Sequence, residues 1–171
     1  MEINEQVAAS TDGESPMTAI PPFETLETLR QLKASYFRLL DTRQWDAWGE
    51  VFTVDAVMDM PEAELHCEGR AEIVGRVREI FTGAITVHHG HTPEIKLIDA
   101  EHAEGIWAME DFLIWPPQQG ETAAVRTSRG YGHYYERYVL DEGVWRIEYT
   151  TLDRLYSGYE TQYRSVRHGG S

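Results

Sequence analysis

The spacing of hydrophobic and polar residues divides the chain into a helical first part and a strand-rich second part. Over residues 24–40, apolar residues recur at intervals of three and four, which predicts an amphipathic helix. A short helix over 45–52 and two short strands around a proline-bearing turn over 54–69 are expected next. A second amphipathic helix is predicted over 70–81, with Gly83 marking its end. The apolar stripe of the first helix consists of Leu29, Leu32, Tyr36, Leu39 and Leu40.

From residue 84 onward the pattern changes to that of β-strands. Long stretches rich in β-branched and aromatic residues are separated by short turn-like segments. These stretches cover residues 91–98, 103–115, 125–140 and 144–156. Helices followed by a meandering sheet predict an α+β domain. We expect a curved, mainly antiparallel sheet wrapped around the long N-terminal helix as a cone, whose open mouth suits a small-molecule pocket.

The two ends of the chain differ in composition from the middle. Residues 1–22 are rich in Ala, Ser, Thr, Gly, Glu and Pro, and we expect a disordered lead-in. Residues 23–165 are predicted to form one domain, and residues 166–171 a frayed tail. A chain of 171 residues is long enough to bury a core as a single domain.

Charge and cysteine content narrow the environment and the partners. The formal net charge is −14, from 29 acidic and 15 basic residues. Such a field repels phosphate backbones and anionic headgroups, so neither nucleic acid nor a membrane is an expected partner. No apolar run approaches the about 18–20 residues that span a bilayer, and the first residues lack the apolar core of a secretory signal. The single Cys67 excludes an internal disulfide, and a cytoplasmic protein is predicted.

Three histidines fall within four positions of the segment VHHGHTPEI, residues 87–95. On an extended strand, His89 and His91 share one face and His88 takes the other. A metal site needs further converging ligands, which this pair does not supply, so we predict neither a metal nor a cofactor. Surface positions account for His89 and His91. His88 is the candidate proton carrier, because a neutral imidazole suits that task at pH 7.

The stretch GIWAMEDFLIW, residues 105–115, must bury one carboxylate whichever way the strand faces. With one parity, Asp111 faces the interior among Trp107, Met109 and Leu113; with the other, Glu110 does. A buried carboxylate needs a partner or a function. The pattern of residues leaves both parities open.

Two further residues near the end of the first helix have two interpretations each. Tyr36 lies on the apolar stripe, so its hydroxyl either tethers the core or serves a site. Asp41 lies at the unfavourable end of the helix dipole for an anion. It either caps the following helix or provides a carboxylate at the mouth of the cone that orients a histidine.

These residues resemble those of a known family. The segments at 32–48, 87–95, 104–115 and 142–156 resemble the SnoaL-like group of the nuclear transport factor 2-like (NTF2-like) superfamily. Within it they are most similar to bile-acid 7α-dehydratases and more distantly to scytalone dehydratases. The similarity covers roughly residues 24–165 but not the loop PPQQGETAAV. This loop is longer than in the bile-acid enzymes, and Leu113 lies near the place of a second catalytic histidine in scytalone dehydratases.

The resemblance implies an enzyme of the hydro-lyase class. It implies cofactor-independent elimination of water from a hydroxylated steroid-like or polycyclic ketone. His88 would take a proton while Asp41 or Asp111 orients it, and Tyr36 would stabilise the enolate or protonate the leaving oxygen. A ketosteroid-type isomerase, a polyketide cyclase and a non-catalytic ligand-binding module remain alternatives. The implied catalytic residues are Tyr36, Asp41, His88, Asp111 and Arg154, and the predicted substrate-binding residues are Trp107, Met109 and Tyr134.

The resemblance also implies a homo-oligomer, a trimer or a dimer. Relatives associate through the exposed face of the sheet, and the strands here hold more aromatic residues than one cone interior needs. The surplus aromatic residues are Trp107, Trp115, Tyr131, Tyr135 and Tyr138.

Overall fold

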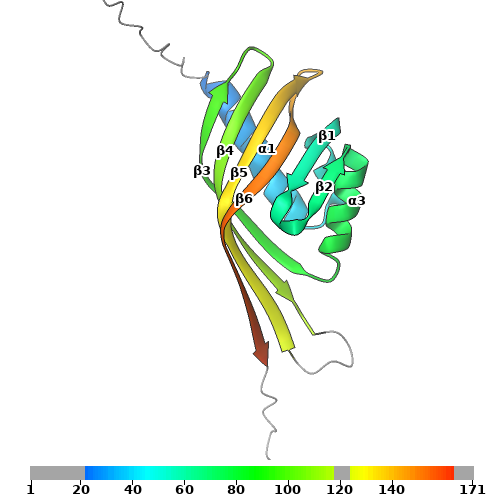
Figure 1. Ribbon diagram of the computed structural model, residues 1–171. Coiled ribbons are helices and arrows are strands. Elements are labelled where there is room, and N and C mark those ends of the chain that lie inside the picture. The colour runs from blue at the N-terminus through cyan, green and yellow to red at the C-terminus, as the bar shows by residue number, and fades with distance from the viewer. Residues whose placement is uncertain (1–21, 118–123, 164–171) are drawn as a thin grey trace, which may run out of the picture.

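The protein is an α+β domain in which a long, curved, open sheet partly encloses helix α1 (Figure 1). The structure, a computed structural model, describes residues 22–117 and 124–163. The predicted lead-in up to residue 21, the tail from residue 166 and the centre of the 116–125 loop lie outside the described residues. The cone-like α+β architecture expected from the order of elements is confirmed.

The helices lie where the periodicity of the sequence predicts them. Their bounds are α1 Phe23–Asp41, α2 Trp45–Gly49, η1 Pro61–Ala63 (a 3-10 turn) and α3 Arg70–Ile80. The buried face of α1 includes Lys33 between Leu29 and Tyr36, whereas the predicted stripe member Leu32 is only half-buried. After α3 the chain turns at Gly83, whose φ of 74° favours glycine.

In the described part of the chain, six strands form one sheet in the order β2-β1-β6-β5-β4-β3. The pair β1 and β6 is parallel, and the other neighbours are antiparallel. The strand β3 begins six residues earlier than predicted, so the histidine segment lies within it. The strand bounds are β1 Phe52–Met60, β2 Leu65–Glu68, β3 Ile85–Leu97, β4 His102–Trp115, β5 Ala124–Asp141 and β6 Val144–Tyr163.

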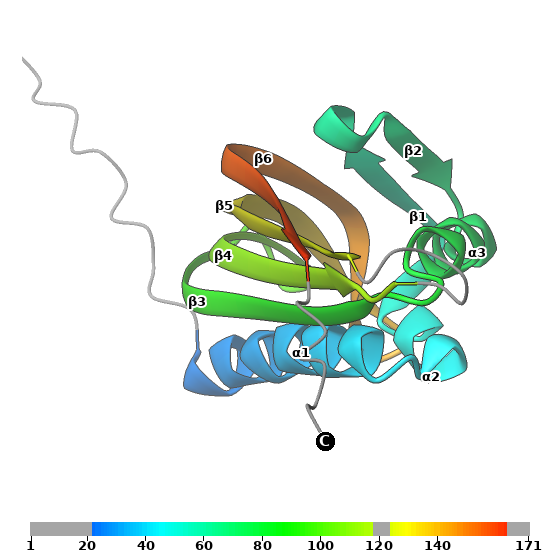
Figure 2. The same ribbon diagram turned by 90° about the horizontal axis from the view of Figure 1, so that it is seen from below.

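The helices cover the concave side of the sheet at both edges. Figure 2 shows α1 alongside β3, while β1, β2 and α3 gather beyond β6. Between them lies one apolar core that includes Trp48, Phe52, Ile73 and Ile147, all fully buried. Figure 1 shows that β4, β5 and β6 continue well beyond α1. This extension leaves room for a cavity on the concave side.

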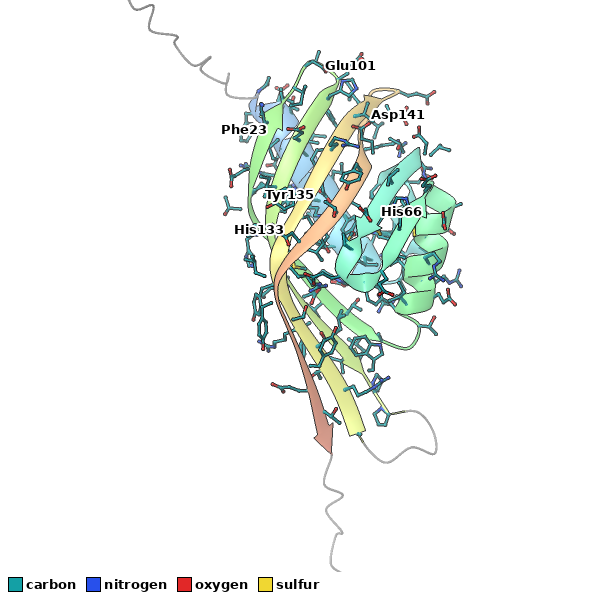
Figure 3. All side chains as sticks on the ribbon, in the orientation of Figure 1. Phe23, His66, Glu101, His133, Tyr135 and Asp141 are labelled. Atoms are coloured by element: carbon teal, nitrogen blue, oxygen red, sulfur yellow. The ribbon has the colours of Figure 1, made fainter. Side chains whose placement is uncertain are left out.

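The two faces of the sheet settle the parity of β4. Asp111 is 4% exposed, whereas the side chain of Glu110 is 40% exposed on the opposite face. The interior carboxylate is therefore Asp111. His133 and Tyr135 lie on the convex face of β5 (Figure 3).

The five aromatic residues that were expected on the exposed face of the sheet do not all lie there. Trp107 and Tyr138 are buried in the core, so they are not available on the convex face. Tyr131 and Tyr135 are exposed. Trp115 shares the inward face of β4 with Asp111 and Leu113 and lines the cavity on the concave side. Three of the five aromatic residues therefore contribute nothing to an interface on the convex face, and the oligomer itself stays a prediction.

Candidate functional site

A cavity of about 290 Å³ opens on the concave side of the sheet. Its apolar wall comes from the helices α1 and α3 and from several strands, and includes Leu40, Met58, Leu65, Val77, Leu113 and Leu152. Five polar side chains of the predicted site also line it: Tyr36, His88, Asp111, Tyr134 and Arg154. An apolar cavity with a few converging polar groups is typical of a small-molecule site.

Asp41, the last residue of α1, contacts both the ring and the backbone of His88. His88 Nδ1 lies 2.7 Å from Asp41 Oδ1, and the backbone N–H of His88 donates to Asp41 Oδ2 at 2.8 Å. The N-cap position of α2 is Gln44, so Asp41 does not cap the next helix. Because an ionised carboxylate only accepts hydrogen bonds, this contact places the imidazole proton on Nδ1. Nε2 of the neutral ring is then able to accept a proton.

Two aromatic rings restrict the His88 side chain further. The ring of Phe37 lies parallel to the imidazole, with centroids 6.4 Å apart and an interplanar angle of 10°. Phe81 approaches at 5.7 Å with its ring tilted. His88 is only 6% exposed but lines the cavity. The side chain is therefore fixed in orientation beside the space that a ligand would occupy.

Asp111 lies directly opposite His88 in the register of β3 and β4, but its ion-pair partner is Arg154. Arg154 Nη2 donates to Asp111 Oδ2 at 2.5 Å. Burial acts to lower the pKa of Arg154, but the hydrogen bond and charge of Asp111 outweigh it and raise that pKa. The other oxygen, Asp111 Oδ1, is buried without a hydrogen-bond partner among the described residues.

The pair of Asp111 and Arg154 crosses the intervening strand β5 above Gly130. Gly130 pairs with Asp111 in the register of β4 and β5. On β6, a register shift leaves Leu155 out of the pairing and separates Arg154 from Tyr156. A Cβ atom at Gly130 would overlap the Arg154 guanidinium and lie 2.6 Å from Asp111 Oδ1. The pair occupies the place of a side chain, which explains the glycine in mid-strand.

Tyr36 and Tyr134 line the same cavity. The pKa of Tyr36 is raised well above its ordinary value by burial, by the nearby Tyr134 and Glu136, and by a side-chain hydrogen bond with Tyr134. Burial and the charge of Asp111 also raise the pKa of Tyr134. Both phenols therefore stay protonated at neutral pH and can act as hydrogen-bond donors.

Sequence reasoning missed the buried ion pair of Lys33 and Glu136 beneath these tyrosines. Lys33 Nζ lies 2.6 Å from Glu136 Oε1, and both side chains are fully buried. The ammonium lies 4.2 Å from the ring centroid of Tyr36 and 3.8 Å from that of Tyr134. A lysine four residues after Leu29 on the apolar stripe was the available signal.

Two of the predicted substrate-binding residues are not part of the cavity lining. Trp107 and Met109 are 4% and 2% exposed and belong to the apolar core. The indole N–H of Trp107 donates to the Tyr138 hydroxyl at 2.7 Å. Both residues share the inward face of β4 with Asp111, but they lie nearer the packed end of the cone. The third, Tyr134, does line the cavity.

The other histidines of the 87–95 segment lie away from the cavity. His89 is exposed and faces Glu110 at 3.2 Å, and His91 is exposed. Within residues 22–117 and 124–163, no group of three or more His, Cys, Asp or Glu side chains is placed to hold a metal ion. None of the helices in this part of the chain is long and apolar enough to cross a membrane.

Comparison with known proteins yields one family and several similar folds. The family model described as SnoaL-like domain matches residues 23–151. A protein of Novosphingobium aromaticivorans provisionally named a scytalone dehydratase superimposes with a TM-score of 0.69 at 15% identity, over 86% of this chain and 96% of its own. A provisionally named aromatic ring hydroxylase from the same species gives 0.69 at 21%, over 84% and 96%. A hexachlorocyclohexane dehydrochlorinase of Novosphingobium barchaimii gives 0.67 at 15%, over 80% and 90%. At these identities the likeness shows the fold alone.

Proposed function

We propose that this chain, which belongs to the SnoaL-like domain family, is a cofactor-independent dehydratase. Its substrate would be a hydroxylated steroid-like or polycyclic ketone. The observation that carries the proposal is the pair of Asp41 and His88, which directs the imidazole into an apolar cavity. A volume of about 290 Å³ lies near the lower end of ordinary ligand pockets and suits one compact, rigid molecule.

The first step needs a base for an acidic C–H bond, which lies beside the carbonyl group of a β-hydroxy ketone or at the γ carbon of its vinylogue, a conjugated enone. His88 Nε2 accepts this proton, and Asp41 stabilises the imidazolium through Nδ1. The electron pair of the C–H bond moves toward the carbonyl oxygen as an enolate. Tyr36 and Tyr134 are protonated donors at the same cavity and would stabilise the negative oxygen.

The second step breaks the bond from carbon to the leaving hydroxyl group. The enolate electrons form the new double bond, and the hydroxyl oxygen leaves with the C–O electron pair. The proton held by His88 passes to this oxygen, so the products are an unsaturated ketone and water, and His88 is regenerated. Asp111 and Arg154 would orient the polar end of the substrate, since both line the cavity.

Elimination is also the reaction class in the names of two similar folds, a dehydratase and a dehydrochlorinase. A dehydrochlorinase removes a proton and a chloride, and a dehydratase removes a proton and a hydroxide. Both need a positioned base in a cavity that excludes water. This agreement supports elimination, while the proposal itself rests on the site residues of this chain.

The decisive experiment incubates the protein with a 7α-hydroxy-3-oxo-4-ene steroid and follows loss of water by mass spectrometry. We expect turnover by the unchanged protein and a loss of about 10²–10⁴-fold in His88→Ala. His91→Ala is the matched control, because His91 is exposed on the same strand. A His88→Ala protein that binds and turns over the steroid as before would contradict the proposed role of His88. Steroid binding without any turnover by the unchanged protein would favour the non-catalytic module.

We further propose that the enzyme acts in the cytoplasm as a homo-oligomer, a trimer or a dimer. The exposed aromatic residues on the convex face of β5, Tyr131 and Tyr135, support association through the sheet. Light scattering at micromolar concentration tests it, and a monomer mass would contradict it.

A further inference from the structure

Arg43 connects the end of α1 to the beginning of β3. Its φ of 60° lies in the left-handed region, which is uncommon for a residue other than glycine. The guanidinium donates to the carbonyl of Leu40 at 2.8 Å, to Thr86 Oγ1 at 2.9 Å and to the carbonyl of Ala84 at 2.7 Å. The backbone of Arg43 is strained and its side chain makes three hydrogen bonds, which together indicate a functional role for this residue.

The side chain of Arg43 is also packed between aromatic rings. Its guanidinium carbon lies 5.6 Å from the ring centroids of both Trp45 and Phe81. Phe81 is one of the two rings that pack against His88. The arginine is therefore restrained by hydrogen bonds and by cation–π contacts, one of them with a ring that also packs against His88.

Thr86 connects Arg43 to Asp41 through two hydrogen bonds. Arg43 can only donate, so the Thr86 hydroxyl accepts from it and has its own single proton left to donate. That proton goes to Asp41 Oδ1 at 2.8 Å. Thr86 is 4% exposed, so water does not replace this contact freely. The direction of the hydroxyl is thereby determined by its two neighbours.

Asp41 consequently accepts three hydrogen bonds, two of them from His88 and one from Thr86. We propose that Arg43 and Thr86 are positioning residues that fix the Asp41 carboxylate, and through it the orientation and tautomer of His88. The effect of this positioning on catalysis rests on the proposed function. A merely structural role would be to join α1 to β3, and the two roles predict different results.

The test compares Thr86→Val with Thr86→Ser. Valine has nearly the shape of threonine but no hydroxyl group, whereas serine keeps the donor. NMR of ¹⁵N-labelled histidines reads the His88 Nδ1 proton and the tautomer without any substrate. We expect the unchanged protein and Thr86→Ser to show a slowly exchanging Nδ1 proton. We expect Thr86→Val to show faster exchange and a mixture of tautomers.

With the steroid substrate, Thr86→Val should lower kcat on the order of 10-fold and leave KM within about twofold, because the misplaced group is not a binding contact. Thr86→Ser should restore kcat. Thermal denaturation of each variant shows whether it is folded. If Thr86→Val does not fold, Arg43→Lys is measured in the same way, because lysine keeps the charge but lacks the planar fork whose two nitrogens reach Thr86 and Ala84 separately.

The inference is overturned if Thr86→Val keeps the Nδ1 proton and tautomer of the unchanged protein. It is equally overturned if Thr86→Ser behaves like Thr86→Val. If Thr86→Val shows the expected NMR changes but the protein without substitutions turns over no steroid, the positioning of His88 is supported. The dehydratase proposal is then the one that is contradicted.

Discussion

The concave face of the sheet holds two ion pairs that differ in how completely their carboxylates are satisfied. Glu136 Oε1 accepts from Lys33 at 2.6 Å and from Thr150 at 3.0 Å, and Oε2 accepts from Tyr138 at 2.5 Å. Asp111 accepts from Arg154 through Oδ2, and its Oδ1 lacks a partner within residues 22–117 and 124–163. The first pair is sealed inside the core, and the second borders the cavity.

The difference indicates that the Lys33–Glu136 pair stabilises the fold, whereas the Asp111–Arg154 pair belongs to the candidate site. A buried ion pair is tolerable only when every charged oxygen has donors, and the Glu136 network meets that condition. Burial lowers the pKa of Lys33, and the charge and hydrogen bond of Glu136 oppose that effect. The Lys33 ammonium makes cation–π contacts with the rings of Tyr36 and Tyr134. Asp111, by contrast, keeps an unsatisfied oxygen beside the cavity, which is typical of a site completed by a ligand.

Removing the cation from the sealed pair should have the largest effect on stability. In Lys33→Met, the Glu136 carboxylate stays buried without its counter-charge, so we expect the free energy of unfolding to fall by about 3–5 kcal/mol. The double variant Lys33→Met/Glu136→Gln should recover much of that loss. Urea denaturation measures both. A loss below about 1 kcal/mol in the single variant would show that the two pairs are energetically alike.

Gly130→Ala should separate Arg154 from Asp111 by steric overlap alone. The added Cβ takes the place of the guanidinium, and we expect a destabilisation of about 1–3 kcal/mol together with a severe loss of turnover. Gly75→Ala is the matched control, because nothing lies within 4 Å of the point that an added Cβ would occupy there on α3. That variant should be stabilised by up to about 1 kcal/mol. Similar melting curves for the two variants would argue against the pairing across β5.

Asp111→Asn should affect activity far more than stability. Arg154 is 22% exposed and can be solvated, so we expect about 1 kcal/mol of destabilisation. Turnover should fall by about 10²-fold or more if Asp111 acts beside His88. The double variant His88→Ala/Asp111→Asn should be little slower than His88→Ala, since members of one unit do not add. Steady-state kinetics decides, and additive losses would place Asp111 outside that unit.

The smallest effect belongs to an exposed pair, His102 and Asp99. The hydrogen bond of Asp99 raises the pKa of His102, and backbone donation from Glu101 followed by His102 lowers the pKa of Asp99. Because the folded pKa of His102 is raised, its contribution to stability is present below about pH 6.5 and is lost as pH rises through the folded value. An NMR titration should show this shift, and Asp99→Asn should remove it with little change in Tm. An unshifted His102 would contradict it.

Much of this architecture follows from local patterns. The stripe that includes Leu29, Tyr36 and Leu40 predicts α1, and alternation in β4 limits the interior carboxylate to Asp111 or Glu110. The same alternation correctly separates His88 from His89. Lys33 was overlooked, because a lysine within an apolar stripe is ordinarily read as solvent-facing. Its burial depends on Glu136, which is 103 residues away along the chain.

Local patterns in the chain were enough to define the elements, their order, the family and the inward side of His88. The partners depend on the folded molecule: Asp41 for His88, 47 residues apart, and Arg154 for Asp111, 43 residues apart. Asp111 is the strand neighbour of His88, so local reasoning could not choose between the two carboxylates. Three features of the folded molecule pair Asp41 with His88 and Asp111 with Arg154. They are the position where α1 ends against β3, the register shift on β6 and the space above Gly130. Such pairings depend on distances between elements that no local periodicity contains.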